Sequence, residues 1–206
     1  MTRFAPTLAL ALASMTFLAV PHSAAEEVAF DFADPKGVNG VVFVLDSELE
    51  PIVGMIGGVS GTVNFDPENP GAINGEVSVD LAQLSFVNSG MTDVLAGWLK
   101  ISDGFVATFE FKGVEAVGES DGPGVAVETR GTMKFGGLDL PKSILIEATH
   151  LPDGAKARGG AEEGDLLVLR AAFEVSRKDL GIQKDMPTDK VGETISVIVP
   201  IVGYSK

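Results

Sequence analysis

The chain of 206 residues contains no cysteine, two histidines and one tryptophan, and these scarcities remove several classes of function. Without cysteine, disulfides and the usual zinc or copper ligation are excluded, so stability must come from a packed interior. His22 falls in the N-terminal segment treated below, which leaves His150 as the histidine for a Ser-His-Asp arrangement. No Gly-x-Ser-x-Gly elbow surrounds a candidate serine. We predict no catalytic residue, no metal and no cofactor.

Basic residues are also few. The sequence has 15 lysines and arginines against 29 aspartates and glutamates, a formal net charge of −14. A polyanion repels phosphate backbones and anionic lipid surfaces, which excludes nucleic acid as a partner and leaves room only for transient membrane contact. Carboxylate pairs such as Asp46 and Glu48 lie two residues apart on a predicted strand, as a glycosidase would need. With 29 acids, such pairs are expected by chance, and a solvated face explains them.

The N-terminal segment is typical of an export signal. Arg3 gives a basic start, residues 8–20 are mostly apolar, and small residues precede a cleavage site after Ala25. The apolar run is far shorter than the roughly 20 residues needed to span a bilayer. We therefore expect residues 1–25 to be a cleaved signal peptide. Residues 26–206 are then one domain, with a formal charge of −15 from 14 basic and 29 acidic side chains, in the periplasm or secreted.

What remains is dominated by apolar and polar residues that alternate with a period of two. Phe105, Phe109 and Phe111 share one face of a predicted strand, while Glu110 takes the other. Residues 89–99 break the alternation with apolar residues three and four apart, which favours a short helix. Strands are predicted over residues 28–32, 40–49, 52–65, 75–84, 105–117, 125–135, 143–151, 166–177 and 194–202. Such a long antiparallel sheet with one helix removes its edges by closing into a barrel.

Three segments together carry a family resemblance. Residues 59–70 read Val-Ser-Gly-Thr-Val-Asn-Phe-Asp-Pro-Glu-Asn-Pro, residues 131–141 read Gly-Thr-Met-Lys-Phe-Gly-Gly-Leu-Asp-Leu-Pro, and residues 173–182 read Phe-Glu-Val-Ser-Arg-Lys-Asp-Leu-Gly-Ile. In motif, order and spacing they resemble the YceI-like family of periplasmic polyisoprenoid-binding proteins, over nearly all of the mature chain. The resemblance implies an all-β, lipocalin-like antiparallel barrel of about eight strands with one short helix, and an apolar lumen that holds a lipid or isoprenoid tail.

On this hypothesis the protein is a carrier that sequesters a polyisoprenoid, quinone or similar hydrophobic small molecule. Met91, Leu95 and Trp98 could form a lid over the lumen, or their helix could plug one end of the barrel for stability alone. Val94 and Ala96 stand where many family members carry His and Arg, so recognition of a head group there does not carry over. The predicted ligand-binding residues are Phe43, Leu45, Met91, Leu95, Trp98, Phe105, Phe109, Phe111, Met133, Phe135, Leu169, Phe173, Val197 and Val199.

Several alternatives stay open at this point. The inward faces could instead pack into a solid core, which would describe a ligand-free stress or interaction protein of the cell envelope. Arg177 and Asp179 could reach a ligand head group, or form a structural pair beside the turn at Gly181. An enzyme is the third alternative, and clustering of His150 with a serine and a carboxylate in one cleft would favour it. The sequence does not distinguish a monomer from a homodimer.

Overall fold

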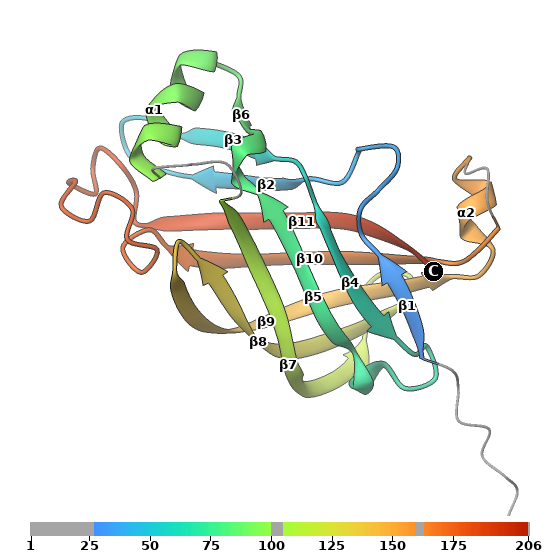
Figure 1. Ribbon diagram of the computed structural model, residues 1–206. Coiled ribbons are helices and arrows are strands. Elements are labelled where there is room, and N and C mark those ends of the chain that lie inside the picture. The colour runs from blue at the N-terminus through green and yellow to red at the C-terminus, as the bar shows by residue number, and fades with distance from the viewer. Residues whose placement is uncertain (1–26, 100–104, 160–162, 206) are drawn as a thin grey trace, which may run out of the picture.

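The computed structural model describes residues 27–99, 105–159 and 163–205. The proposed signal peptide, residues 1–25, lies outside these ranges and stays a prediction. The described chain folds into an antiparallel β-barrel with few helices, which confirms the all-β, lipocalin-like fold class (Figure 1). Within these ranges, no helix has the length and apolar character that crossing a membrane requires.

Eight strands close the barrel through backbone pairing. The order around the ring is β1-β4-β5-β7-β8-β9-β10-β11, and β11 pairs back to β1. Every pairing is antiparallel. Closure removes free strand edges from the ring, as the alternation predicted. The ring strands are β1 Val28–Asp31, β4 Ser60–Phe65, β5 Asn74–Asp80, β7 Val106–Glu119, β8 Val125–Phe135, β9 Leu138–Leu151, β10 Leu166–Ser176 and β11 Thr194–Ser205.

Three short strands extend the sheet beyond the ring. β2 (Val41–Leu45), β3 (Ile52–Ile56) and β6 (Leu84–Phe86) form what we call the wing, which continues from β11 in that order. β11 changes partner along its length, because residues 195–198 pair with β2 and residues 204–205 pair with β1. The wing therefore lies at one end of the barrel, beside α1 (Figure 1).

The structure divides the single strand predicted over residues 52–65 into β3 and β4. Gly58 lies at the break with a φ of +60°, and a Cβ atom there would lie 2.8 Å from Cβ of Asp80. Only glycine combines this backbone conformation with such a close approach. The sharp bend sends the chain from the wing into the closed ring.

The helix α1 (Ser89–Leu99) has the predicted bounds and covers the inner face of the wing. Oδ1 of Asn88 caps it by accepting a hydrogen bond from the amide of Gly90 at 2.9 Å. Leu95 is buried among Leu45 and Ile52 of the wing. The remaining helical pieces of the described chain are the 3-10 turns η1 Pro70–Ala72 and η2 Leu81–Gln83 and the short α2 Gly154–Ala157.

Buried apolar side chains form two large clusters at opposite ends of β10 and β11. One includes Phe30, Phe32 and Leu167, all 0% exposed, and we call this region the packed end. The other joins the wing to α1, and we call that region the wing end. The register of β11 separates them, since Ile201 belongs to the first and Ile195 packs against the second. One end of the barrel is thus a solid core.

A buried asparagine holds the packed end where the chain passes from β1 to β2. Asn39 is 8% exposed. Its Nδ2 donates to the carbonyls of Phe32 at 3.0 Å and Val202 at 2.8 Å, and its Oδ1 accepts from the amide of Val202 at 3.0 Å. Because buried backbone groups need partners, Asn39 takes the place of strand pairing at this crossing.

An ion pair ties the same segment to the end of α2. Nη1 of Arg158 lies 2.8 Å from Oδ1 of Asp34, and Nη2 lies 3.1 Å from Oδ2. Burial by itself raises the pKa of Asp34. Hydrogen bonds from Arg158 and from the amides of Val38 and Lys36 outweigh that effect and hold the pKa at about 2. The carboxylate is therefore a stabilising group of the packed end.

Candidate functional site

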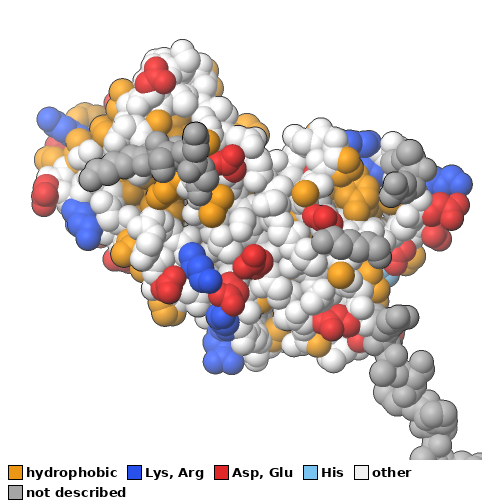
Figure 2. All heavy atoms as spheres, viewed as in Figure 1, with side chains coloured by type: hydrophobic (Ala, Val, Ile, Leu, Met, Phe, Trp, Pro, Cys, Tyr) orange, Lys and Arg blue, Asp and Glu red, His pale blue; other side chains and the backbone are white. Residues whose placement is uncertain are grey.

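A partly enclosed cavity of about 230 Å³ lies between the packed end and the wing end. Inward-facing side chains of the wing, α1, η2, β5, β7 to β11 and residues 177–182 line it. All of these side chains are apolar except Thr108 and Arg177. Figure 2 shows hydrophobic side chains gathered beside α1, at the wing end. Small-molecule sites are concave and mostly apolar, with volumes of roughly 300 to 1,000 Å³, and this cavity approaches that size.

The cavity is elongated along the strands. On β10 its lining runs from Leu169 to Val175, which is about 20 Å of strand at about 3.3 Å per residue. Phe111 and Ile201 of the packed core close it at one end, whereas Leu95 and Trp98 of α1 bound it at the other. This shape suits a slender extended molecule.

Some side chains of the cavity lining are less buried than those of the packed end. Phe109, Phe173 and Val199 pack against the core cluster but are only partly buried. Phe30 and Phe65, in contrast, are 0% and 2% exposed. Inward-facing aromatic rings stay accessible only where space lies in front of them, so the barrel combines a solid half with a hollow half.

Arg177 lies where β10 ends, and it is 0% exposed. Its Nε donates to the carbonyl of Gly192 at 2.9 Å, Nη1 donates to Ile182 at 2.9 Å and also to Gln183, and Nη2 donates to Met186 and Val191, each at 3.3 Å. A guanidinium has five N–H donors, so these carbonyls use all of them. Arg177 therefore organises the loop of residues 182–192 and has no donor left for a ligand.

Asp179 does not accept from Arg177, so the predicted structural pair is absent. The Asp179 amide donates a hydrogen bond to Oγ of Ser176 at 3.3 Å, and the Asp179 side chain is exposed. Loop carbonyls replace the carboxylate as partners of the buried charge. The architectural interpretation of Arg177 is the one that its geometry supports.

Comparison with models of known protein families shows to which family the chain belongs. The family model for the YceI-like domain matches residues 27–202. The chain belongs to the YceI-like family. No curated protein sequence matches it.

Solved structures of YceI-like and related proteins have the same fold. BcnA of Burkholderia cenocepacia is similar with a TM-score of 0.61 at 17% identity, over 80% of this chain and 95% of that one. The YCEI protein of Campylobacter jejuni gives 0.58 at 14% identity, over 78% and 89%. A polyisoprenoid-binding domain from Saccharophagus degradans, implicated in plant cell wall breakdown, gives 0.60 at 10% identity, over 88% and 100%. At these identities the likeness shows the fold.

Most of the residues predicted to bind ligand line the cavity of this YceI-like barrel. They are Phe43, Leu45, Leu95, Trp98, Phe109, Phe111, Met133, Phe135, Leu169, Phe173, Val197 and Val199. Their contact with a ligand stays a prediction. Strand alternation located them because β-strand side chains point alternately to the two faces of the sheet.

Met91 and Phe105 do not line the cavity, in contrast to the prediction. Met91 lies one helical turn before Leu95 and packs against the wing-end cluster instead. Phe105 precedes the start of β7, and its ring stacks edge-on against Phe135 with centroids 5.5 Å apart. In the lid predicted from α1, Leu95 and Trp98 are the members that reach the cavity.

Other lining residues were not predicted. Ile144 and Ile146 alternate on β9 and could have been found by the same rule. Leu180 and Ile182 follow the end of β10 in a turn without periodicity. They reach the cavity because Arg177 donates a hydrogen bond to the carbonyl of Ile182. The spacing of apolar residues in the sequence does not predict this contact.

His150 does not form a catalytic triad. Its Nε2 lies 2.8 Å from Oδ2 of Asp165, and its ring packs against Phe30 at the packed end. Oγ of Ser205 accepts from the Asp165 amide at 2.9 Å, so this serine is bound to the backbone and not to the imidazole. The amide of Asp153 and the imidazole, despite burial, lower the pKa of Asp165. Within the described ranges, no group of three or more His, Asp or Glu residues is arranged to hold a metal ion.

Proposed function

We propose that this YceI-like protein binds a lipid-like molecule, a polyisoprenoid, quinone or similar amphiphile, with its apolar tail in the barrel cavity. The observation that carries the proposal is the elongated apolar cavity, bounded by the packed core at one end and by α1 at the other. The Saccharophagus degradans domain of the same fold, whose name records polyisoprenoid binding, supports this ligand class.

The driving force is removal of the tail from water. Each buried methylene contributes about 0.8 kcal/mol, so a five-carbon isoprene unit contributes roughly 3 to 4 kcal/mol. Membrane hydrocarbon stabilises the same tail by a similar amount. Exchange between a bilayer and an equally apolar lumen is therefore nearly neutral, which suits a reversible carrier.

Besides the indole of Trp98, the polar side chains of the described lining are Thr108 and Arg177, and both are already paired. The Thr108 hydroxyl is 2.7 Å from that of Ser78, and the guanidinium of Arg177 is saturated by carbonyls. Val94, where many relatives carry histidine, is 46% exposed on α1 and is not among the lining residues. The protein therefore recognises the tail, and the head group stays toward the wing end.

An exported carrier needs such a compartment for the tail because a long isoprenoid cannot cross an aqueous space unaided. The signal peptide expected over residues 1–25 would deliver the protein to the periplasm or outside the cell. The mechanism is reversible partitioning into the lumen, with no covalent step.

Native mass spectrometry with lipid extraction, on protein purified from its own host, tests the proposal. We expect a hydrophobic molecule at near-unit stoichiometry. Trp98, the one tryptophan of the sequence, lines the cavity and provides a second measurement, because a bound quinone should quench its fluorescence. Protein without bound lipid that also shows no quenching in a quinone titration would support the alternative, a ligand-free interaction protein of the cell envelope.

A further inference from the structure

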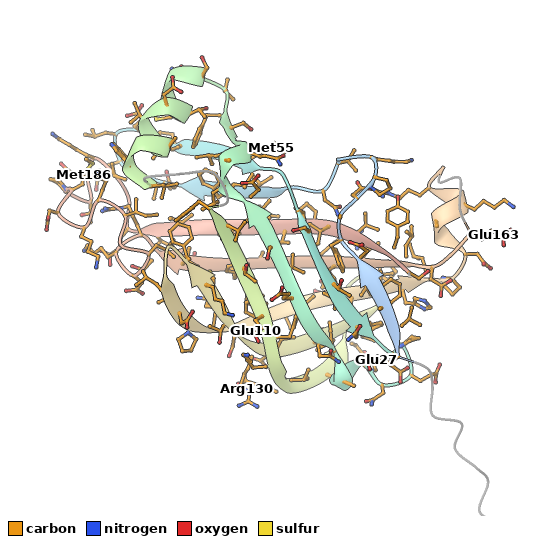
Figure 3. The ribbon with its side chains drawn as sticks, viewed as in Figure 1. Glu27, Met55, Glu110, Arg130, Glu163 and Met186 are labelled. Carbon is orange, nitrogen blue, oxygen red and sulfur yellow. The ribbon has the colours of Figure 1, made fainter. Side chains whose placement is uncertain are left out.

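The outer face of the wing is apolar and exposed. Val53 and Met55 of β3 are 52% and 53% exposed, Ile198 of β11 is 47% exposed, and Val87 after β6 is fully exposed. The register joins them, since Ile198 is opposite Val42 and Val42 is opposite Met55. Directly paired residues have Cβ atoms about 4.5 to 5.5 Å apart. Val42, Val53, Met55 and Ile198 form one continuous surface, which we call the outer wing patch; Val87 directly follows Phe86, the partner of Gly54, and Met55 is labelled in Figure 3.

The outer face of the ring differs from that of the wing because it carries charged side chains among its exposed apolar ones. On β7, Glu110 forms ion pairs with Lys112 and with Lys134 of β8. Leu145 of β9 is 57% exposed, but it lies opposite Glu128. Single exposed apolar residues among charges are ordinary, whereas a continuous exposed patch marks an interaction surface.

The strands that carry the patch also carry part of the cavity lining. Phe43, Ile56 and Leu84 point inward from β2, β3 and β6, so the wing is apolar on both faces. The packed end closes the other side of the barrel. A tail that enters the cavity from the end opposite the packed core passes beside the patch.

Size and charge favour a neutral lipid surface over a second copy of the chain. A stable dimer interface uses about 20 to 30 residues on each side, many more than the patch provides. Asp46, Glu48 and Glu50 are exposed in the turn between β2 and β3 and border the wing. Their charge repels anionic lipids and the same turn of another copy, while uncharged or zwitterionic head groups meet no such barrier.

We propose that the outer wing patch docks on a zwitterionic lipid surface, so that the isoprenoid tail moves between bilayer and lumen without crossing water. This inference rests on the proposed function. Amphipathic surfaces of this kind insert shallowly at the boundary between head groups and acyl chains, and their binding scales with the apolar area they bury.

The test compares Val53→Ser/Met55→Ser with the matched control Leu145→Ser, which removes an equally exposed apolar residue from the ring. Co-sedimentation with phosphatidylcholine vesicles measures docking. Trp98 quenching by a quinone added from ethanol, without vesicles, measures lumen binding separately. We expect the double variant to lose about tenfold or more of its vesicle partitioning and to keep lumen binding, with the control unchanged in both. Binding of the unaltered protein should weaken when phosphatidylglycerol replaces phosphatidylcholine at low salt.

Three results would overturn the inference. In the first, the double variant sediments with phosphatidylcholine vesicles as well as the unaltered protein does. In the second, the unaltered protein prefers phosphatidylglycerol. In the third, light scattering shows a dimer that the double variant dissociates, with no vesicle binding, which would assign the patch to a second copy. Absence of both co-purified lipid and quinone quenching in the unaltered protein would instead refute the proposed function, separately from the result of the docking measurement.

Discussion

Filling the cavity should have opposite effects on stability and on ligand binding. Ala171 lies on β10 and lines the cavity, whereas its neighbour Ala172 is exposed on the outer face of the same strand. Their cross-strand partners on β11 are Val199 and Ile198. The pair Ala171→Phe and Ala172→Phe therefore adds the same aromatic ring to adjacent positions, inside and outside the barrel.

The size of both effects follows from the volume added. Alanine to phenylalanine adds roughly 100 Å³, or about three water-sized volumes of about 30 Å³ each. At about 24 cal/mol per Å³ of cavity removed, Ala171→Phe gains about 2 kcal/mol of unfolding free energy if the ring fits without strain. That gain corresponds to a rise of about 4 to 8 °C in Tm for a domain of this size. If the ring displaces one isoprene unit, ligand affinity falls by roughly 3 kcal/mol, which is more than a hundredfold.

Thermal unfolding of delipidated protein and Trp98 quenching by a quinone measure the two effects on the same samples. Ala172→Phe should leave quinone affinity unchanged. Equal affinity in Ala171→Phe and the unaltered protein would refute the idea that the ligand occupies this part of the lumen. Equal loss in both variants would show that the effect does not come from filling the cavity.

Three further substitutions test the framework around the cavity. Asp34→Asn should lower the unfolding free energy at pH 7 by about 2 kcal/mol, since the folded pKa of about 2 lies below the ordinary value of 3.8. That stabilisation is complete above the pKa of the unfolded state and is lost as the pH falls through the pKa of the folded state. The unfolding free energies of the unaltered protein and of Asp34→Asn, measured in urea, should therefore converge near pH 2. A difference that stays constant with pH would contradict this account. Arg177→Lys should lower the unfolding free energy by about 2 to 3 kcal/mol, because an ammonium has only three donors. It should also speed amide hydrogen exchange in residues 182–192. Unchanged exchange would show that this loop does not depend on the guanidinium. Asn39→Leu should lower the unfolding free energy in urea by about 2 to 4 kcal/mol, because it removes the partners of the Val202 amide and carbonyl, and a loss below about 1 kcal/mol would mean that those two groups find other partners.

The spacing of apolar residues predicted those helices and strands in which that spacing is regular. The predicted helix over residues 89–99 and the strand over residues 125–135 match α1 and β8. β9 begins five residues before its predicted start, at Leu138. Pro141 lacks an amide donor, yet it pairs with Thr132 inside the ladder between β8 and β9. Non-local pairing overrides a local signal at this position.

Other features depend on contacts between distant segments and have no periodic signal. β6 has only three residues and is held by β3 through the pairs formed by Gly54 and Phe86 and by Met55 and Ser85. The inward faces were predictable, but the space between them was not, because it depends on how far opposite walls stand apart once the barrel closes. Alternation fits a solid barrel and a hollow one equally well, and this chain builds both, one at each end.

The division between a solid and a hollow half has an energetic reason. A cavity of about 230 Å³, if nothing fills it, costs roughly 5 kcal/mol at about 24 cal/mol per Å³. Since domains are stable by only about 5 to 15 kcal/mol in total, the hollow half depends on strong packing elsewhere. The phenylalanine core, Asn39 and the Asp34 ion pair supply it at the far end. A tail that fills the cavity recovers much of the cost, and at a concentration of 100 times its Kd it adds about 2.7 kcal/mol of stability. Ligand should therefore raise the Tm of the unaltered protein more than that of Ala171→Phe, in which the cavity is already reduced.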